Sequence, residues 1–305
     1  MKNILILMST FNGDKYITEQ LNSILSQKNV NIHLLIRDDG STDATLNILK
    51  KYKSQYPNKI YLIQCNNLGC KESFFNLIIF AAENFKGYDY YAFSDQDDVW
   101  LPNKIYAATT SLDSFNNELK LYYCKPQYVD QYLNYLTTNT VEAKGTLPEA
   151  FILAPALGCS MVFNEPVLKI LSEACAKNIN CLHDTLAYRL TLALGGKVIY
   201  DNYPHLLYRQ HSLNVVGGVQ STKKRWKRRI GWFIKGNRYK SEVARDILKY
   251  FDNRISEEHK EILRFISSYH HSLYIKYKIL SSKKFRSNKR FHNIMFSVAI
   301  IFNKI

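Results

Sequence analysis

The N-terminal stretch ILILMSTFNG, residues 4–13, decides the fold, because an apolar run ends abruptly in a polar loop that contains a glycine. The run at residues 4–8 is too short for the core of a signal peptide and predicts a buried strand. Similar apolar runs follow, with segments of helical apolar spacing between them, at residues 32–36, 60–63 and 90–93. Strands that alternate with helices predict an α/β fold with a Rossmann-like, mostly parallel central sheet.

Polar loops follow three of these runs, where each strand is expected to end. They are STFNG at residues 9–13, DDGS at 38–41 and SDQDD at 94–98. In a doubly wound sheet, ligands bind beyond the carboxyl ends of the strands. We therefore expect the three loops to form one site.

Three carboxylates, Asp95, Asp97 and Asp98, stand directly after the fourth run. Such a cluster is costly unless a cation neutralises it. Oxygen ligands suit Mg²⁺ or Mn²⁺, which complete their shells with diphosphate and water. The alternative is a solvated acidic turn that caps a helix starting near Pro102, and this is the usual explanation of an isolated Asp-x-Asp.

The loop RDDGSTD, residues 37–43, contains a second acidic cluster. Ser41 or Thr42 can cap the following helix, and Asp43 is favourable at its positive end. This explanation leaves the aspartates at positions 38 and 39 unexplained. A carboxylate there can accept hydrogen bonds from a nucleotide base or ribose.

In this order and at this spacing, STFNG, DDGSTD and SDQDDVW resemble the motifs of family 2 glycosyltransferases with the GT-A fold, over roughly residues 1–215. The resemblance implies a nucleotide-sugar donor whose nucleoside is held by Thr10, Asn12 and Asp39. It also implies that Asp95 and Asp97 bridge ribose, metal and diphosphate, with Asp97 the direct ligand of Mg²⁺ or Mn²⁺.

The segment LGCSMVFN, residues 157–164, matches the small-residue strand that these enzymes place beside the acceptor. An ordinary buried strand explains the same residues equally well. Following the resemblance, we expect five residues on the acceptor side: Trp100, Gly158, Cys159, Ser160 and His183. Helices are expected at about residues 166–176 and 183–194, and short strands around 198–200 and 205–209.

The motif His183-Asp184-Thr185 takes the place of the short acidic motif that supplies the general base in these enzymes. An inverting transfer needs one carboxylate to accept the proton of the acceptor hydroxyl, opposite the leaving diphosphate. We therefore assign the catalytic role to Asp184, with a simple charge at a helix N-terminus as the alternative. Many relatives carry a tryptophan soon after this aspartate, whereas Thr185 and Leu186 follow here, so the acceptor-side details stay open.

The segment YRQHSLNVVG, residues 208–217, resembles part of bacterial rhamnosyltransferase-like enzymes that assemble O-antigen (lipopolysaccharide), capsule or cell-wall polysaccharide. The resemblance suggests that His211 completes the metal shell or binds diphosphate. It suggests that Arg209 binds the donor and neutralises the leaving group. A lone histidine is more often structural, but its place beside an arginine and before a glycine-containing loop favours a function.

Charge is distributed unevenly along the chain. Residues 1–220 carry 19 Lys/Arg and 20 Asp/Glu, which gives −1, and residues 221–305 carry 22 and 6, which gives +16. The run KKRWKRR at residues 223–229, followed by apolar residues 230–234, is typical of a helix in a membrane interface. A second basic run at residues 283–290 precedes an apolar segment too short to span a bilayer. Nucleic-acid binding is the rival interpretation of the tail, and we do not expect it for a glycosyltransferase.

We accordingly expect a GT-A glycosyltransferase domain at residues 1–218, with a nucleotide-sugar half at about 1–115 and an acceptor half at about 116–218. Residues 219–305 are expected to form a basic, helical, membrane-associating region. The predicted reaction is inverting transfer of L-rhamnose from dTDP-rhamnose to a lipid-linked oligosaccharide, with a UDP-hexose donor as the alternative. Scattered cysteines without a Cys-x-x-Cys pair fit the reducing cytoplasm. The enzyme is thus expected to be peripheral on the inner face of the bacterial plasma membrane.

Overall fold

The computed structural model describes residues 1–136, 142–211 and 238–305. Contacts within the chain divide it into two compact units. The first contains residues 1–138, 156–191 and 196–209, and the second contains residues 139–155, 192–195 and 210–305. Residues 139–155 therefore cluster with the C-terminal part of the chain. The polybasic run 223–229, the apolar residues 230–234 and Gly217 lie outside the described residues.

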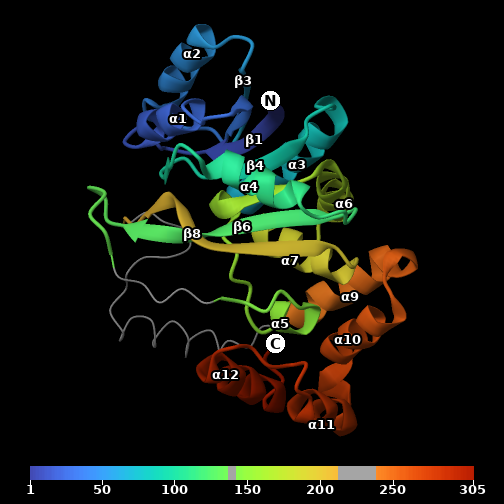
Figure 1. The fold of residues 1–305 in the computed structure, drawn as a ribbon. Helices are drawn as coiled ribbons and strands as arrows, with labels where there is room; N and C mark the ends of the chain where they lie inside the picture. The colour runs from blue at the N-terminus through green and yellow to red at the C-terminus, as the bar shows by residue number, and fades with distance from the viewer. Residues whose placement is uncertain (137–141, 212–237) are drawn as a thin grey trace. The chain divides into compact units, whose positions relative to one another are not determined.

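The first unit contains a sheet of eight described strands in the order β3-β2-β1-β4-β7-β6-β8-β5 (Figure 1). The strands are β1 (Lys2–Thr10), β2 (Val30–Asp38), β3 (Ile60–Gln64), β4 (Tyr90–Ser94), β5 (Val99–Trp100), β6 (Lys120–Val129), β7 (Met161–Phe163) and β8 (Lys197–Arg209). Strands β1, β2, β3 and β4 pair in parallel, as do β6 and β8. Strand β7 is antiparallel to its neighbours, and β5 to β8. The predicted α/β fold with a mostly parallel sheet is confirmed.

Helices cover both faces of the sheet, which explains why β1 is apolar at every central position. The helices of the first unit are α1 (Ile17–Leu25), α2 (Thr45–Gln55), α3 (Cys70–Asn84), α4 (Lys104–Asp113), α6 (Glu165–Ala176) and α7 (His183–Ala193). Ile4, Ile6 and Met8 share a hydrophobic cluster with residues of α1, α2 and α4. The alternate residues Leu5 and Leu7 are equally buried on the other face, where α3 packs against β1.

The register of the strands aligns the loops of interest. Thr10 at the end of β1 pairs with Asp38 at the end of β2, and Met8 pairs with Ser94 at the end of β4. The carboxyl ends of these three parallel strands therefore lie along one edge, as the polar loops predicted.

Two expected elements differ from the structure. The short strands expected around 198–200 and 205–209 form the single strand β8, whose pairing with β6 shifts register at Cys124/Lys125 and again at Lys125/Gln127. The strand expected over 157–164 is correct only for residues 161–163. Gly158–Ser160 form a 3₁₀ turn instead, because the Leu157 carbonyl accepts hydrogen bonds from the Ser160 backbone N–H (2.9 Å) and hydroxyl (2.7 Å).

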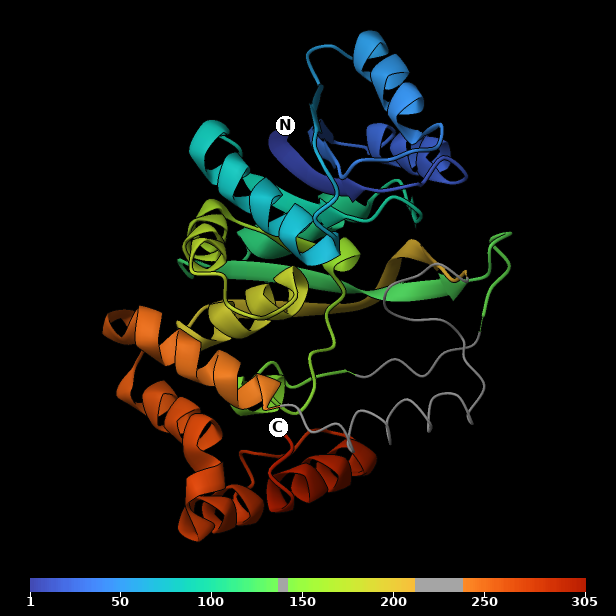
Figure 2. The same cartoon turned by 180° about the vertical axis from the view of Figure 1, so that it is seen from behind.

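The second unit is helical where it is described. It contains α5 (Leu147–Ala150), α9 (Tyr239–Phe251), α10 (Glu257–Ser268), α11 (Leu273–Ser281) and α12 (Arg290–Ile301), seen from behind in Figure 2. The buried Ser241 hydroxyl lies 2.8 Å from the Ile266 carbonyl and 2.9 Å from the Ile305 carbonyl, which ties α9 to α10 and to the end of the chain. Among the described residues, no helix combines the length and apolar character needed to cross a membrane.

Candidate functional site

The loop after β4, residues 95–98, is fixed to the loop after β1 by one glutamine. The Gln96 side chain accepts a hydrogen bond from the Phe11 N–H (2.8 Å) and donates one to the Phe11 carbonyl (3.0 Å). From α1, Gln20 donates to the Ser94 hydroxyl (2.8 Å) and to the Asp95 carbonyl (3.2 Å). The carboxylates are therefore held on a braced loop and not on a free turn.

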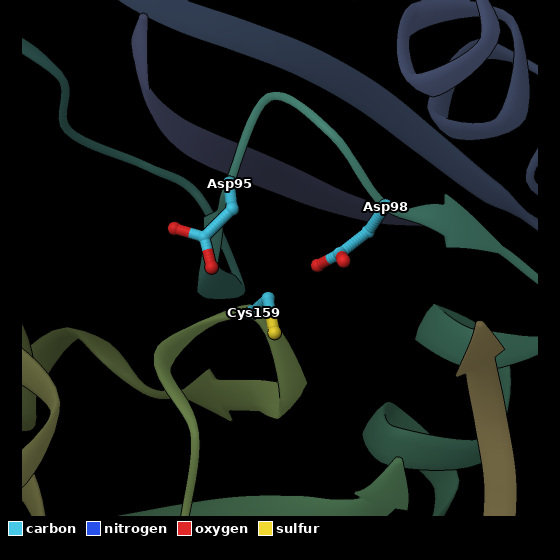
Figure 3. Close-up of side chains that lie close together, drawn as sticks. All are labelled: Asp95, Asp98 and Cys159. Atoms are coloured by element: carbon cyan, nitrogen blue, oxygen red, sulfur yellow. The ribbon is translucent and has the colours of Figure 1, made fainter. Parts of the chain in front are cut away.

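The three aspartates of this loop do not share one environment. Asp95 and Asp98 converge on the Cys159 thiol, and their ligand atoms all lie within 4.8 Å of one another (Figure 3). Asp97 is half-buried, and its backbone carbonyl accepts a hydrogen bond from Arg209. The sequence singled out Asp95 and Asp97, but it gave no indication that Asp98 and Cys159 would meet.

Burial and mutual repulsion oppose ionisation of this cluster. They raise the pKa of Asp95 to about 7, chiefly through loss of hydration and then through the charges of Asp97 and Asp184. The pKa of Asp98 is also raised well above its usual value by burial and by its two neighbours. One Asp98 oxygen, Oδ2, is buried without a hydrogen-bond partner in the described part of the chain. A bound cation would favour ionisation of both aspartates and would give Asp98 Oδ2 a partner.

The second acidic cluster is held by its own loop. Asp38 accepts hydrogen bonds from the Thr10 hydroxyl (2.9 Å) and from the Ser41 hydroxyl (2.6 Å) and N–H (3.0 Å). Asp39 is buried, forms an ion pair with Arg37, and accepts from the backbone N–H groups of residues 68 and 69 at 2.9–3.1 Å. Both carboxylates are thus saturated by protein donors.

The expected helix cap at Ser41 or Thr42 is wrong. Helix α2 begins at Thr45, with no side-chain cap, because the Ser41 hydroxyl is used by Asp38 and by the Asn12 N–H (2.9 Å). Asn12 in turn accepts a hydrogen bond from the Thr42 N–H (2.8 Å). These contacts join the loop after β1 to the loop after β2.

Arg209, at the end of β8, supports the carboxylate loop. Its guanidinium donates to the carbonyls of Asp97 (2.8 Å) and Gln131 (2.8 Å) and forms an ion pair with Glu19. It also lies over the Tyr16 ring, 4.6 Å from the centroid. The Arg209 backbone N–H donates to Asp98 Oδ1 (3.1 Å). The expected donor-binding arginine is therefore buried and engaged with the loop that carries the aspartates.

His183 and Asp184 stand at the first turn of α7. The His183 ring stacks on Phe74 with centroids 3.8 Å apart, and burial lowers its pKa to about 4, so it is neutral. A Cβ on Gly158 would lie 2.6 Å from His183 Nε2, which explains why this position is a glycine. Asp184 is half-buried, and its negative charge raises the pKa of Asp95. The structure therefore brings Asp184 into the electrostatic neighbourhood of the carboxylate loop.

The remaining residues expected on the acceptor side are buried within the protein. Trp100 lies in the hydrophobic core at 2% exposure, so it does not line an open acceptor surface. Cys159 and Ser160 are buried in the 3₁₀ turn. His211 belongs to the second compact unit and is the last residue described before the gap, so its role stays a prediction.

Two residues near the site were missed from the sequence. Lys104, at the start of α4, is fully buried with its Nζ 3.6 Å from the centroid of the Trp100 ring, and burial lowers its pKa to about 8. Asp98 partly opposes this effect. Cys70 opens α3 at an exposed position, and partial loss of hydration followed by the charges of Asp95 and Asp184 raises the pKa of its thiol. The spacing of four positions between Trp100 and Lys104 was the feature of the sequence that could have predicted their contact.

Comparison with known proteins agrees with this geometry. The family model described as Glycosyl transferase family 2 matches residues 5–138. The dTDP-rhamnosyl transferase RfbG of Shigella flexneri is 35% identical over 247 residues, which cover 78% of this chain and 82% of that protein. The putative glycosyltransferase EpsE of Bacillus subtilis is 34% identical over 100 residues, covering 33% of this chain and 34% of that one.

Solved structures show the same fold. Staphylococcus aureus TarS 1–349 in complex with UDP-GlcNAc superposes with a TM-score of 0.56 at 18% identity, covering 93% of this chain and 77% of that one. The mannosyltransferase PcManGT of Pyrobaculum calidifontis, in complex with GDP-Man and Mn²⁺, gives 0.52 at 12% identity, covering 99% and 88%. The predicted GT-A fold is confirmed. With a rhamnosyl transferase similar over most of both chains, this protein belongs to glycosyl transferase family 2.

Proposed function

We propose that the enzyme transfers one sugar from a nucleoside-diphosphate donor to an acceptor hydroxyl with inversion at the anomeric carbon. The observation that carries this proposal is the carboxylate loop. Asp95 and Asp98 meet at the edge where the parallel strands end, and burial raises the pKa of both. Asp184 is close enough to contribute to the raised pKa of Asp95. A donor-side cation site and a base are thereby available within one unit of the fold.

A divalent cation fits the donor atoms of this loop. The unpartnered Oδ2 of Asp98 and the raised pKa of Asp95 both indicate negative charge that the described protein groups do not neutralise. Burial and the two carboxylates raise the pKa of the Cys159 thiol, so sulfur stays protonated and the available ligands are oxygens, which suit Mg²⁺ or Mn²⁺. We assign Asp97 as direct ligand and Asp95 as its companion. When bound, the cation would neutralise charge on the leaving diphosphate.

Asp184 is proposed as the general base. It is half-buried at the first turn of α7, and its neighbour His183 is neutral and locked between aromatic rings. Because burial lowers the pKa of His183 to about 4, it is a poor proton acceptor, and Asp184 is the better candidate to take the proton of the acceptor hydroxyl. Gly158 lies beside this residue, since a Cβ there would be 3.5 Å from Asp184 Cβ, and we propose that the turn formed by Gly158, Cys159 and Ser160 borders the acceptor.

The nucleoside is proposed to lie against the joined loops after β1 and β2. The hydrogen bonds of three side chains, Thr10, Asn12 and Asp39, hold these loops in place. We propose that these residues act by shaping the surface that contacts the base and ribose. Arg209 likewise acts as a positioning residue, because its donors hold the carbonyl of Asp97 and its N–H holds Asp98.

The proposed donor is dTDP-rhamnose. Its support is the similarity to RfbG, a dTDP-rhamnosyl transferase, along most of both chains. The acceptor is proposed to be a lipid-linked oligosaccharide of a surface polysaccharide, delivered at the inner face of the plasma membrane. The excess of positive charge after residue 220 supports this location. In this proposal residues 1–218 perform the transfer and residues 219–305 hold the enzyme at the membrane.

A donor screen tests the proposal. Purified enzyme would be incubated with dTDP-rhamnose, UDP-glucose or UDP-galactose, with Mg²⁺, Mn²⁺ or a chelator, and released nucleoside diphosphate would be measured. We expect release from dTDP-rhamnose that needs a divalent cation and is lost in Asp97→Asn. Preferential release from a UDP-hexose would replace the donor assignment, and full activity in the chelator would remove the metal from the mechanism.

A further inference from the structure

Helix α11 exposes a compact group of apolar and aromatic side chains. Leu273 is 82% exposed, and Tyr274 and Tyr277 are exposed at 64% and 67%. At helical spacing these three side chains fall within an arc of about 100°. The buried residue of this helix, Ile279, lies on the opposite side of the helix. At these positions α11 therefore exposes apolar and aromatic side chains to solvent, where a surface helix usually carries polar ones.

Helix α12 repeats this arrangement. Ile294 is 61% exposed and Ile301 52%, and with Phe291 they follow one face of the helix at spacings of i, i+3 and i+10. The side chains that α12 buries, Phe296 and Ile300, lie on its other side. Helix α12 therefore contributes Phe296 and Ile300 to the core and leaves this second apolar stripe exposed.

The two helices contact each other, and the stretch of chain that contains them is positively charged. The Lys276 ammonium of α11 donates to the Ile301 carbonyl of α12 at 3.2 Å, and Figure 1 shows the pair at the end of the chain. Between residues 273 and 305 the sequence contains no Asp or Glu. The basic residues in this stretch are Lys276, Lys278, Lys283, Lys284, Arg286, Lys289, Arg290 and Lys304.

We propose that α11 and α12 form a docking surface for an anionic lipid bilayer, with the exposed apolar side chains inserted at the headgroup boundary. We call this set the apolar face: Leu273, Tyr274, Tyr277, Phe291, Ile294 and Ile301. Helices of 9 and 12 residues are too short to span a bilayer but long enough to lie in its interface. Long basic side chains can extend from this depth to the phosphates. The excess of positive charge is complementary to anionic headgroups, even though Lys284 is paired with Glu258 of α10 at 2.8 Å.

The composition of the apolar face favours lipid over nucleic acid. Single-stranded nucleic acids are held by aromatic rings on which bases stack, and a duplex by charged and polar side chains. Aliphatic Leu273, Ile294 and Ile301 supply neither, whereas all three gain by leaving water. This inference deepens the proposed membrane location, but it depends on different residues from the polybasic run at 223–229 and is independent of the donor chemistry.

Vesicle co-sedimentation of the full-length protein tests the docking surface. The vesicles would contain equal parts of phosphatidylglycerol and phosphatidylcholine, with pure phosphatidylcholine as the neutral comparison. The apolar variant is Leu273→Ser/Ile294→Ser, and its matched control is Tyr61→Ser/Tyr106→Ser on exposed positions of the first unit. All four positions are exposed, so the variants should fold.

A second pair of variants tests the charge. Lys278→Gln/Lys283→Gln removes two exposed basic residues of the surface, and Lys51→Gln/Lys53→Gln removes two from α2. Each basic residue near anionic lipid contributes about fivefold to partitioning, so the surface variant should bind roughly 25-fold more weakly. The apolar variant should lose roughly tenfold or more, because two large side chains no longer leave water. Both controls should stay within about twofold of the wild type.

The outcomes separate this surface from the enzymatic proposal. Donor-dependent release of nucleoside diphosphate, measured without vesicles, should be unchanged in all four variants. Wild-type vesicle binding in both surface variants would overturn the inference, as would equal binding to neutral and anionic vesicles. Loss of duplex-DNA binding with intact vesicle binding would assign the surface to nucleic acid instead. An inactive wild-type enzyme that still binds vesicles through α11 and α12 would contradict only the proposed transfer.

Discussion

Replacing Asp95 by Asn should change how the stability of the metal-free enzyme depends on pH. In the folded protein the pKa of Asp95 is about 7, raised from 3.8 by burial and by its acidic neighbours. Below about pH 4 both folded and unfolded chains hold this proton, so the group has no effect. Between about pH 4 and pH 7 the unfolded chain releases the proton first, and the free energy of unfolding falls as pH rises. Above about pH 7 the loss is complete.

The size of this loss follows from the difference between the two pKa values. A shift of about three units corresponds to at most ~4 kcal/mol, at ~1.4 kcal/mol per unit. The Asp95 side chain is only half-buried, so water screens part of the repulsion and we expect ~2 kcal/mol. The Asp95→Asn variant cannot ionise at this position. It should therefore gain ~2 kcal/mol relative to the wild type between about pH 5 and about pH 8.

Urea denaturation followed by far-UV circular dichroism, with a chelator present, would measure this difference. Glu83→Gln is the matched control, since it also converts a carboxylate to an amide but on the exposed side of α3. Mg²⁺ or Mn²⁺ should stabilise the wild type more at about pH 8 than at about pH 5, because the ion competes with the proton. Parallel pH profiles for the wild type and Asp95→Asn would refute the reasoning.

Three further predictions concern residues around this loop. Gly158→Ala should cost about 1–3 kcal/mol of unfolding free energy, because the new Cβ would lie 2.6 Å from the enclosed His183 ring; an unchanged urea midpoint would contradict the packing. Asp184→Asn should lower kcat by about 10²–10⁴ with little change in donor KM and in the urea midpoint, and near-normal turnover would remove it as the base. Arg209→Lys should lower the free energy of unfolding by about 1–3 kcal/mol and weaken the apparent metal affinity, since a compact ammonium does not reproduce the planar fork of donors that reaches both carbonyls; wild-type metal titrations would show that the loop does not depend on it.

Much of the donor half was predictable because the strands are buried on both faces. A continuous apolar run such as residues 4–8 has few other places in a soluble fold, and polar loops after parallel strands must meet at one edge. The helix at 166–176 was similarly marked by an early proline, and the structure has α6 at Glu165–Ala176. Patterns within short stretches of sequence were sufficient to predict these strands and this helix.

The errors arose where distant residues compete for the same group. Ser41 is a good helix cap by local rules, but Asn12 and Asp38 use its hydroxyl instead. Trp100 was expected on the acceptor side, whereas its buried ring covers the ammonium group of the buried Lys104. Asp98 and Cys159 are far apart in the sequence, and only the tertiary fold brings them together. Such pairings are set by the arrangement of strands, which single-sequence patterns do not encode.

The order of the strands places an unusual demand on the chain between Ser94 and Val99. These residues end β4 and begin β5, which stand fourth and last in a sheet where β7, β6 and β8 come between them. Four strand spacings in a flat sheet would measure about 19 Å, and five fully extended residues reach at most about 18 Å. The sheet therefore cannot be flat between these two strands, and the register shifts between β6 and β8 mark a place where it can bend. The aspartates lie on the short segment that joins β4 to β5, so inserting or deleting a residue in the distant β6–β8 ladder should change the spacing of the carboxylates without altering the loop itself.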